Sequence, residues 1–154
     1  MSEYHATIEW KRETADFDYK TYNRTHALSF EGGVRVPGSA APGNVPRSAR
    51  GAPGVDPEQA FVASLSSCHM LWFLHLAADA KLVVERYVDE ATGVLEKDAA
   101  GRMVMTRVAL RPVVTYSGRT PTAQEHRQLH ERAHHECYIA NSVKSEVTVE
   151  PRLG

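Results

Sequence analysis

The sequence has few cysteines and no excess of charge of either sign. Among its 154 residues are 2 cysteines, 18 Lys and Arg, and 19 Asp and Glu, which leaves a formal net charge of −1. That balance gives no electrostatic reason to expect nucleic acid or an anionic membrane as a partner. The pattern also contains no internal repeat and no second domain, so we expect a single domain over residues 1–154.

No secretory signal is visible at the N-terminus, because MSEYHATIEW contains no basic segment followed by an apolar one. We therefore expect a reducing, cytoplasmic location. Two cysteines in that compartment are more often buried, metal-bound or redox-active than joined in a structural disulfide. The cysteine pair is consequently the first candidate for chemistry.

One segment is long and uncharged enough to raise the question of a membrane span. Residues 60–78 contain no Asp, Glu, Lys or Arg, and their length approaches that of a bilayer-spanning helix. The segment nevertheless contains three serines and two histidines, and it begins with the capping residues of a soluble helix. We interpret it as a central buried helix and expect no membrane partner.

The N-terminal third predicts short strands and a long loop. Alternating apolar and polar residues predict a strand with one buried face over 3–13, and similar patterns favour strands at 24–31 and 34–36. Residues 37–55 are rich in proline and glycine and predict a long loop, of the kind that often acts as a functional lid. A simple insertion without a role is the other interpretation of this loop.

The remainder of the chain predicts two capped helices and three more strands. Asp56 can cap the first helix, Pro57 suits its first position, and Gln59 can close a capping box. Thr122 and Glu125 form a similar box before the second helix. The expected elements are a helix to about residue 80, strands over 82–98 and 102–116 joined by a turn at 98–101, a polar helix over 121–136, and a strand over 146–150. This order predicts an α+β fold.

Both cysteines are expected to point inward, from different helices. Cys68 falls on one stripe of the first helix with Phe61, Leu65 and Trp72, and Cys137 ends the second helix on its apolar side. The plainer interpretation of Cys68 is a small core residue. Two inward cysteines can also meet in space, although the sequence does not give their separation.

Redox chemistry at a buried cysteine requires partners. The thiolate is the reactive form, and apolar surroundings raise the pKa of a thiol. An arginine can compensate, because it is always charged and can hold a peroxide oxygen, and a carboxylate can orient the arginine. A thiol peroxidase therefore needs a cysteine, an arginine and an acid in one place.

Two motifs resemble those of the OsmC/Ohr family. Residues 56–68 (DPEQAFVASLSSC) resemble its pattern of Asn/Asp-Pro-Glu-Gln/Glu, a helix of small residues, and a cysteine ten residues after the glutamate. Residues 133–142 (AHHECYIANS) resemble its second motif, in which a His-rich helix ends in a cysteine. The family often has proline directly after this cysteine, whereas this chain has Tyr138.

The resemblance implies an OsmC-like α+β fold, with antiparallel sheets packed on a central helix, and an intertwined homodimer with sites built from two subunits. It implies reduction of organic hydroperoxides, and of hydrogen peroxide less well, without a cofactor. Cys68 would attack the peroxide and Cys137 would form a disulfide with it. A dithiol reductant of the lipoyl or thioredoxin type would restore both thiols.

The resemblance also implies two further site residues. Glu58 matches the family glutamate, although an acid in the first turn of a helix also favours the helix dipole. Arg24 is the best match to the family arginine, and Arg35, Arg47 and Arg50 are its rivals. The predicted catalytic residues are Arg24, Glu58, Cys68 and Cys137.

Two other functions stay open. Histidines and a cysteine recur along one face of the second helix and could bind a metal, although histidines on a polar helix are more often solvated. This candidate ligand set is His126, His130, His134 and Cys137, with Cys68 as a further donor. A non-catalytic dimer could instead bind an apolar small molecule, in a pocket lined by residues such as Trp72 and Phe73.

Overall fold

The computed structural model describes all 154 residues, which form two compact units. Residues 1–60 make up the first unit and residues 61–154 the second. Two long helices and three sheets, each of three strands, give the mixed α+β architecture that the sequence predicts. The expectation of a single domain over residues 1–154 stays a prediction.

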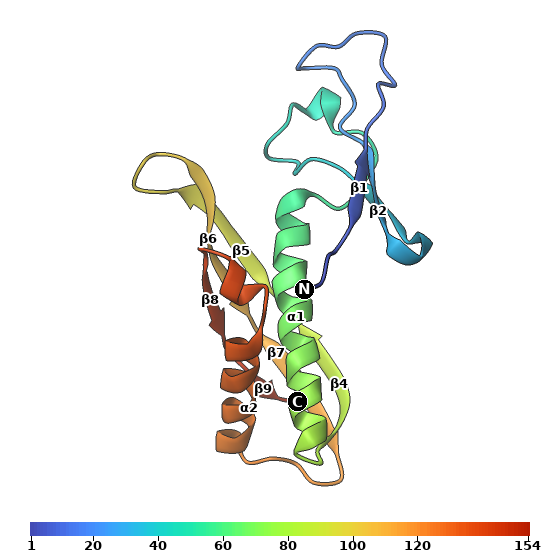
Figure 1. Cartoon of the computed structure of the whole chain (residues 1–154). Helices are drawn as coiled ribbons and strands as arrows, with labels where there is room; N and C mark the ends of the chain where they lie inside the picture. The colour runs from blue at the N-terminus through green and yellow to red at the C-terminus, as the bar shows by residue number, and fades with distance from the viewer. The chain divides into compact units, whose positions relative to one another are not determined.

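The first unit contains a sheet of three short strands (Figure 1). They are β1 (Ala6–Glu9), β2 (His26–Phe30) and β3 (Arg35–Gly38), antiparallel in that order. The sequence predicts that one face of the first strand is buried. In the single chain this prediction is wrong, because Ile8 is 60% exposed. The reason is that β1 is an edge strand, and a sheet of three short strands buries little surface without a covering layer.

The predicted loop after β3 is tied together at its base. Gly38 and Val55 pair in an isolated parallel bridge, and the Ser39 hydroxyl donates to the Gly54 carbonyl at 3.0 Å. Between these ends the loop contains one short 3-10 helix, Arg47–Ala49. A loop of this length is therefore confirmed, while its action as a lid stays a prediction.

Helix α1 (Pro57–Asp79) begins as the capping pattern predicts. The Gln59 N–H donates to the Asp56 carboxylate at 2.7 Å, and the Asp56 N–H donates to the Gln59 side chain at 3.4 Å. These bonds satisfy backbone groups that every helix start leaves unpaired. The helix ends two residues before Lys81, whose left-handed φ of 59° turns the chain into the next strand.

Only part of α1 is buried in the single chain, although the sequence predicts a helix buried on almost every side. Its buried residues are Leu65, His69, Phe73, Leu76 and Ala77. Leu71, by contrast, is 63% exposed. By length and composition α1 could cross a membrane, but the core helices of soluble proteins pass the same test, so this finding carries little weight.

The second unit contains six strands in two sheets. They are β4 (Val83–Asp89), β5 (Thr92–Lys97), β6 (Met103–Leu110), β7 (Pro112–Ser117), β8 (Glu146–Val149) and β9 (Arg152–Leu153). Each of the two long strands predicted from the sequence is divided in two, because Pro112 has no N–H and Asp89 accepts the Arg111 N–H at 2.6 Å. β4 pairs with β7, and β5 with β6, both antiparallel. β8 and β9 join parallel to β6 and β7, so these sheets are mixed rather than wholly antiparallel as expected.

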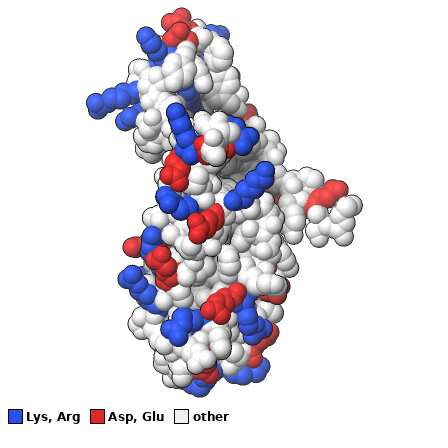
Figure 2. Space-filling view, turned by 90° about the vertical axis from the view of Figure 1, so that its left-hand side faces the viewer, with Lys and Arg blue, Asp and Glu red and all other residues white.

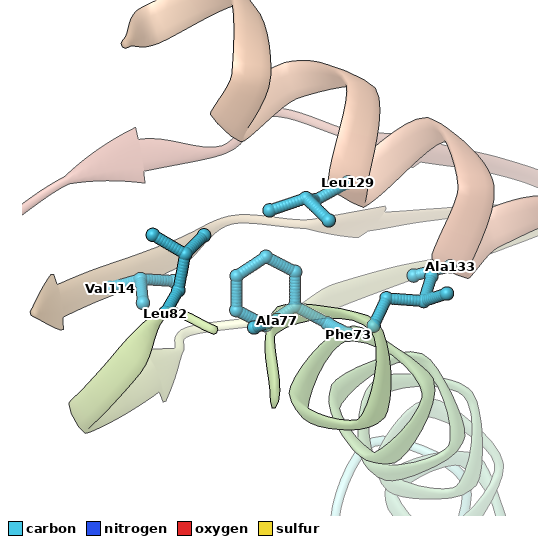
Figure 3. Close-up of a cluster of buried hydrophobic side chains, with 7 residues drawn as sticks. Phe73, Ala77, Leu82, Val114, Leu129 and Ala133 are labelled. Carbon is cyan, nitrogen blue, oxygen red and sulfur yellow. The ribbon is translucent and has the colours of Figure 1, made fainter. Parts of the chain in front are cut away.

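Helix α2 (Ala123–Glu136) packs against α1 in the core of the second unit. Its predicted capping box is confirmed, since Thr122 and Glu125 each accept the other's backbone N–H through their side chains. The buried cluster in Figure 3 joins both helices to the β4–β7 sheet. Its members are Phe73, Leu76, Ala77, Leu82, Val114, Leu129 and Ala133. Burial of each large apolar side chain of this kind stabilises the fold by about 1.5–3 kcal/mol.

The surface shows no region of a single charge sign on the face drawn in Figure 2, where Lys and Arg alternate with Asp and Glu. Several charged side chains of the protein are paired, such as Arg119 with Glu125 at 3.1 Å and Arg102 with Asp98 at 2.8 Å. Exposed pairs of this kind contribute little to stability. The distribution agrees with the balanced composition of the chain.

Candidate active site

Cys68 lines an apolar pocket within the second unit. The pocket has a volume of about 500 Å³ and is formed by α1 and by the segment that follows α2. Its lining residues are Ser64, Ser67, Cys68, Leu71, Trp72, His75, Tyr138 and Ile139. The spacing of three and four residues along α1 places the lining residues of that helix on one of its sides. An apolar molecule of moderate size could therefore reach the Cys68 thiol.

The thiol of Cys137 lies next to the thiol of Cys68. Cys137 caps the C-terminal end of α2, is 1% exposed, and accepts a hydrogen bond from the Ala140 N–H at 3.4 Å. Burial first, and then hydrogen bonding with Cys68, raise the pKa of Cys137 to about 11. Both cysteines are free, and Cys68 is only partly buried. The two helices thus bring together two thiols that lie far apart in the sequence.

Two aromatic side chains border this pocket. Trp72 and Tyr138 meet edge to face, with ring centroids 5.5 Å apart and ring planes at 88°. Phe73, which we expected to line a pocket with Trp72, is instead fully buried in the core. That expectation is wrong because adjacent residues on a helix point about 100° apart.

Arg24 lies in a different pocket, within the first unit. This pocket has a volume of about 530 Å³ and is lined by four aromatic residues, by Arg24 and Glu58, and by part of the loop after β3. Arg24 is 7% exposed, and its guanidinium donates to the carbonyl oxygens of Tyr22 at 2.6 Å and Tyr19 at 2.7 Å. The guanidinium carbon also lies 3.3 Å from the centre of the Tyr22 ring. These contacts fix the position of the charge.

Glu58 lines the same pocket as Arg24 without forming an ion pair with it. Its carboxylate accepts a hydrogen bond from the Asn44 side chain at 3.2 Å, and Asn44 belongs to the long loop. Arg24 and Glu58 do not form the two-pronged pair that the sequence suggested, and two N–H groups of Arg24 bind backbone carbonyls instead. The sequence therefore brings these two residues into one pocket but not into direct contact.

The rival arginines lie outside this pocket. Arg35 pairs with Glu9 at 3.5 Å, and both side chains are largely exposed. Arg47 and Arg50 are exposed on the loop, and neither lines the pocket that contains Glu58. Among the four candidate arginines, Arg24 alone shares a pocket with the glutamate, and its chemical role stays a prediction.

Three histidines form a buried cluster that the sequence does not announce. His69 on α1, and His126 and His130 on α2, are almost completely buried, contrary to the expectation of solvated histidines on a polar helix. His69 Nε2 and His130 Nδ1 share a hydrogen bond of 2.9 Å, and His126 Nδ1 pairs with the Tyr116 hydroxyl at 2.8 Å. The one available signal was helical spacing, since these two α2 histidines flank Leu129 on its inward face.

The metal-site alternative finds no assembled ligand set. No three His, Cys, Asp or Glu side chains among the 154 residues converge in an arrangement that could hold a metal ion. His130 uses one ring nitrogen in its bond with His69, and the sulfur of Cys137 accepts from Ala140. The helical spacing that suggested this site fixes the face of each residue but not the direction of its donor atom.

Comparison with known proteins decides the family. A family model described as OsmC-like protein matches residues 49–152. The chain belongs to this OsmC-like family. A solved OsmC-like protein of unknown function from Vibrio cholerae is 46% identical, with a TM-score of 0.94, and the match covers 98% of this chain and 99% of that one. The resemblance read from the two cysteine motifs is therefore confirmed.

Solved OsmC-like structures with functional names are more distant. The organic hydroperoxide resistance protein OhrB of Bacillus subtilis is 19% identical, with a TM-score of 0.65 and coverage of 99% of this chain and 98% of that one. An organic hydroperoxide resistance protein from Legionella pneumophila is 17% identical, with a TM-score of 0.62 and coverage of 100% and 99%. At these identities the likeness establishes the shared fold alone. No curated protein matches the chain.

Proposed function

We propose that this OsmC-like protein is a thiol-dependent peroxidase that reduces organic hydroperoxides, and hydrogen peroxide less well. The observation that carries the proposal is the position of Cys68, which lines an apolar pocket and has the buried Cys137 thiol as its neighbour. A two-cysteine peroxidase needs one thiol open to substrate beside a second thiol shielded from it. The names of the distant relatives from Bacillus subtilis and Legionella pneumophila support the same direction.

In the proposed reaction, the Cys68 thiolate attacks the terminal oxygen of a hydroperoxide ROOH. The S–O bond forms as the O–O bond breaks, and the leaving alkoxide takes a proton to become the alcohol ROH. The Cys137 sulfur then attacks the sulfenic acid on Cys68, which forms the disulfide and releases water. A dithiol of the lipoyl or thioredoxin type reduces this disulfide by thiol exchange and is itself oxidised.

The surroundings of the two cysteines support this assignment of roles. Cys137 is 1% exposed and, with its pKa raised to about 11, stays a neutral thiol at neutral pH. A neutral, shielded thiol is a poor attacker of peroxide, yet it remains available to a sulfenic acid that forms beside it. We therefore assign peroxide attack to Cys68 and disulfide formation to Cys137.

Arg24 and Glu58 are proposed to supply the charge that the first step needs. An arginine that is always protonated can stabilise a thiolate and hold a peroxide oxygen through its remaining N–H groups. The contacts of Arg24 with the carbonyls of Tyr19 and Tyr22 hold the guanidinium in one orientation. Glu58 lines the same pocket, and we propose that it orients Arg24 when substrate is bound.

The proposed enzyme is a cytoplasmic homodimer in which each site is built from two subunits. Support for a dimer comes from large apolar side chains that the single chain leaves exposed, among them Ile8, Leu71 and Tyr138. Exposed apolar side chains that gather in patches commonly mark an interface. No metal or organic cofactor takes part in the proposed peroxide step.

A non-catalytic binding protein is the second candidate function. The pocket beside Cys68 favours it, because Leu71, Trp72 and Ile139 make much of its lining apolar. In that case the pocket would hold an apolar small molecule, and the cysteines would be inert toward peroxide.

The two candidates are separated by peroxide consumption. Reduced protein is supplied with a dithiol and either cumene hydroperoxide or hydrogen peroxide, beside Cys68→Ser and Cys137→Ser. We expect wild type to turn over, with faster use of the organic peroxide, and Cys68→Ser to be inactive. Cys137→Ser should stop at the sulfenic acid. If reduced wild type leaves both peroxides unconsumed, the peroxidase proposal fails and the binding protein is the remaining function.

A further inference from the structure

Two buried histidines connect the helices that carry the cysteines. His69 Nε2 on α1 and His130 Nδ1 on α2 share a hydrogen bond of 2.9 Å. Their rings stack with centroids 5.2 Å apart and planes 9° from parallel. The two residues are 0% and 1% exposed. Apart from the contact between the two thiols at the end of α2, this is the side-chain hydrogen bond that joins α1 to α2, two elements that otherwise meet through apolar contacts.

The histidine pair lies close in sequence to both thiols. His69 directly follows Cys68 on α1. His130 precedes Cys137 by seven residues, which is two turns along the same face of α2. A rotation or slide of one helix at the histidine pair would therefore move one sulfur relative to the other.

We propose that His69 and His130 are positioning residues, whose hydrogen bond holds Cys68 and Cys137 in register for disulfide formation. This inference rests on the proposed function, since it concerns the step in which the second thiol meets the oxidised first one. An unstrained disulfide needs Cα atoms roughly 4.4–6.8 Å apart and side chains directed at each other. Two helices that carry its cysteines must therefore keep a narrow range of relative positions.

A directional bond is suited to this task. Apolar contacts, such as those of Phe73 with Leu129 and Ala133 in Figure 3, resist separation of the helices more than small sliding motions. The His69–His130 bond depends on both distance and angle, and in an apolar interior its loss leaves two buried polar atoms unpaired. Phe73 also stacks on the His130 ring, with centroids 4.0 Å apart, which restricts rotation of that ring.

The protonation state of the pair suits a hydrogen bond between two rings. Burial lowers the pKa of His69 to about 4 and that of His130 to about 2, so both rings are neutral at neutral pH. One ring then donates and the other accepts. The titratable groups that face the pair are His126 and His134 on α2 and Tyr87 on β4. Burial lowers the pKa of His126 and raises that of Tyr87, which favours the neutral form of both.

The test measures how readily the two thiols form a disulfide, without any peroxide. Reduced full-length protein is equilibrated with reduced and oxidised glutathione, and the share with a Cys68–Cys137 disulfide is measured after acid quenching. His69→Leu removes the bond, whereas His69→Gln and His130→Asn each return an amide near the lost ring nitrogen. Tyr116→Phe is the matched control, because it removes a partly buried hydrogen bond of His126, which lies one turn from His130 on α2. That bond leads to β7 instead of α1.

We expect the effective concentration of the thiol pair to fall by about fivefold to tenfold in His69→Leu, as loss of one buried hydrogen bond predicts. The amide variants should recover most of it, and Tyr116→Phe should match wild type even where it lowers thermal stability. If His69→Leu does not fold, His130→Leu removes the same bond from the other helix and tests the same equilibrium. Wild-type disulfide formation in the folded leucine variant, or a loss in Tyr116→Phe as large as the loss in that variant, would overturn the inference. Because no peroxide is used, the outcome is independent of whether the protein proves to be a peroxidase.

Discussion

Cys68 and Cys137 place the same functional group in two different surroundings. Cys68 lines a pocket, while Cys137 is buried with its pKa raised to about 11. His69 and His130, between the same two helices, are as deeply buried as Cys137, and burial keeps both rings neutral. The side chains that decide the chemistry are therefore distinguished by burial more than by residue type.

At this scale the stability of the fold should depend on pH through His69. Burial, and then the nearby charge of His134, lower its pKa in the folded state from 6.5 to about 4. The folded state thus resists protonation of His69. The neutral ring makes its full contribution to stability above pH 6.5, and that contribution is lost as the pH falls toward 4. We expect a loss of about 2 kcal/mol by pH 5 from this residue alone, with His126 and His130 acting in the same direction.

Urea unfolding near pH 7.5 and near pH 5 measures this loss. His69→Leu should lose less stability between the two conditions than wild type, because it lacks one of the protonation sites. If wild type and His69→Leu lose the same free energy of unfolding on acidification, His69 is not held neutral in the folded protein.

Among the elements, α2 carries Cys137, and its start is fixed by a capping box. The Thr122 hydroxyl accepts the Glu125 N–H at 3.1 Å, and the Glu125 carboxylate accepts the Thr122 N–H at 2.8 Å. Thr122→Ala should therefore lower the free energy of unfolding by about 1 kcal/mol. Thr120→Ala is the control, since Thr120 lies in the same approach to the helix without a capping bond. Equal losses in both variants would show that the cap does not stabilise α2.

Elements with local signals could be predicted from the sequence. Asp56 with Gln59, and Thr122 with Glu125, mark the starts of the two helices because a capping box lies within four residues. Pro112 gives a local signal for the break between β6 and β7, but the hydrogen bond from the Arg111 N–H to the Asp89 carboxylate joins residues 22 positions apart. Hydrogen bonds between distant residues leave no local pattern.

The candidate site could likewise be predicted only where its signals are local in the sequence. The sequence motifs select Cys68 and Cys137, but only the packing of α1 on α2 makes them neighbours. The sequence also left four arginines as candidates, and the pocket that contains Glu58 separates Arg24 from the others. The bond between His69 and His130 had no counterpart in the sequence, since its two residues are 61 positions apart.

At the scale of the whole molecule, a dimer with shared sites predicts that two inactive variants can rescue each other. A mixed dimer of Cys68→Ser and Arg24→Ala chains would hold one site with both residues intact. Statistical pairing then restores about a quarter of the wild-type activity in an equal mixture. The measurement is peroxide consumption after the two chains are unfolded together and refolded. Each variant refolded alone is the control, and no activity in the mixture would rule out sites shared between subunits.

The central claim is that Cys68 reacts with peroxide and Cys137 then joins it in a disulfide. The most direct test is the intact mass of reduced protein after one equivalent of cumene hydroperoxide, with peptide mapping, beside Cys137→Ser. We predict that wild type loses two hydrogen atoms and yields one Cys68–Cys137 cross-linked peptide, while Cys137→Ser gains one oxygen atom on Cys68. An unchanged mass in wild type, or oxygen placed first on Cys137, would contradict the account.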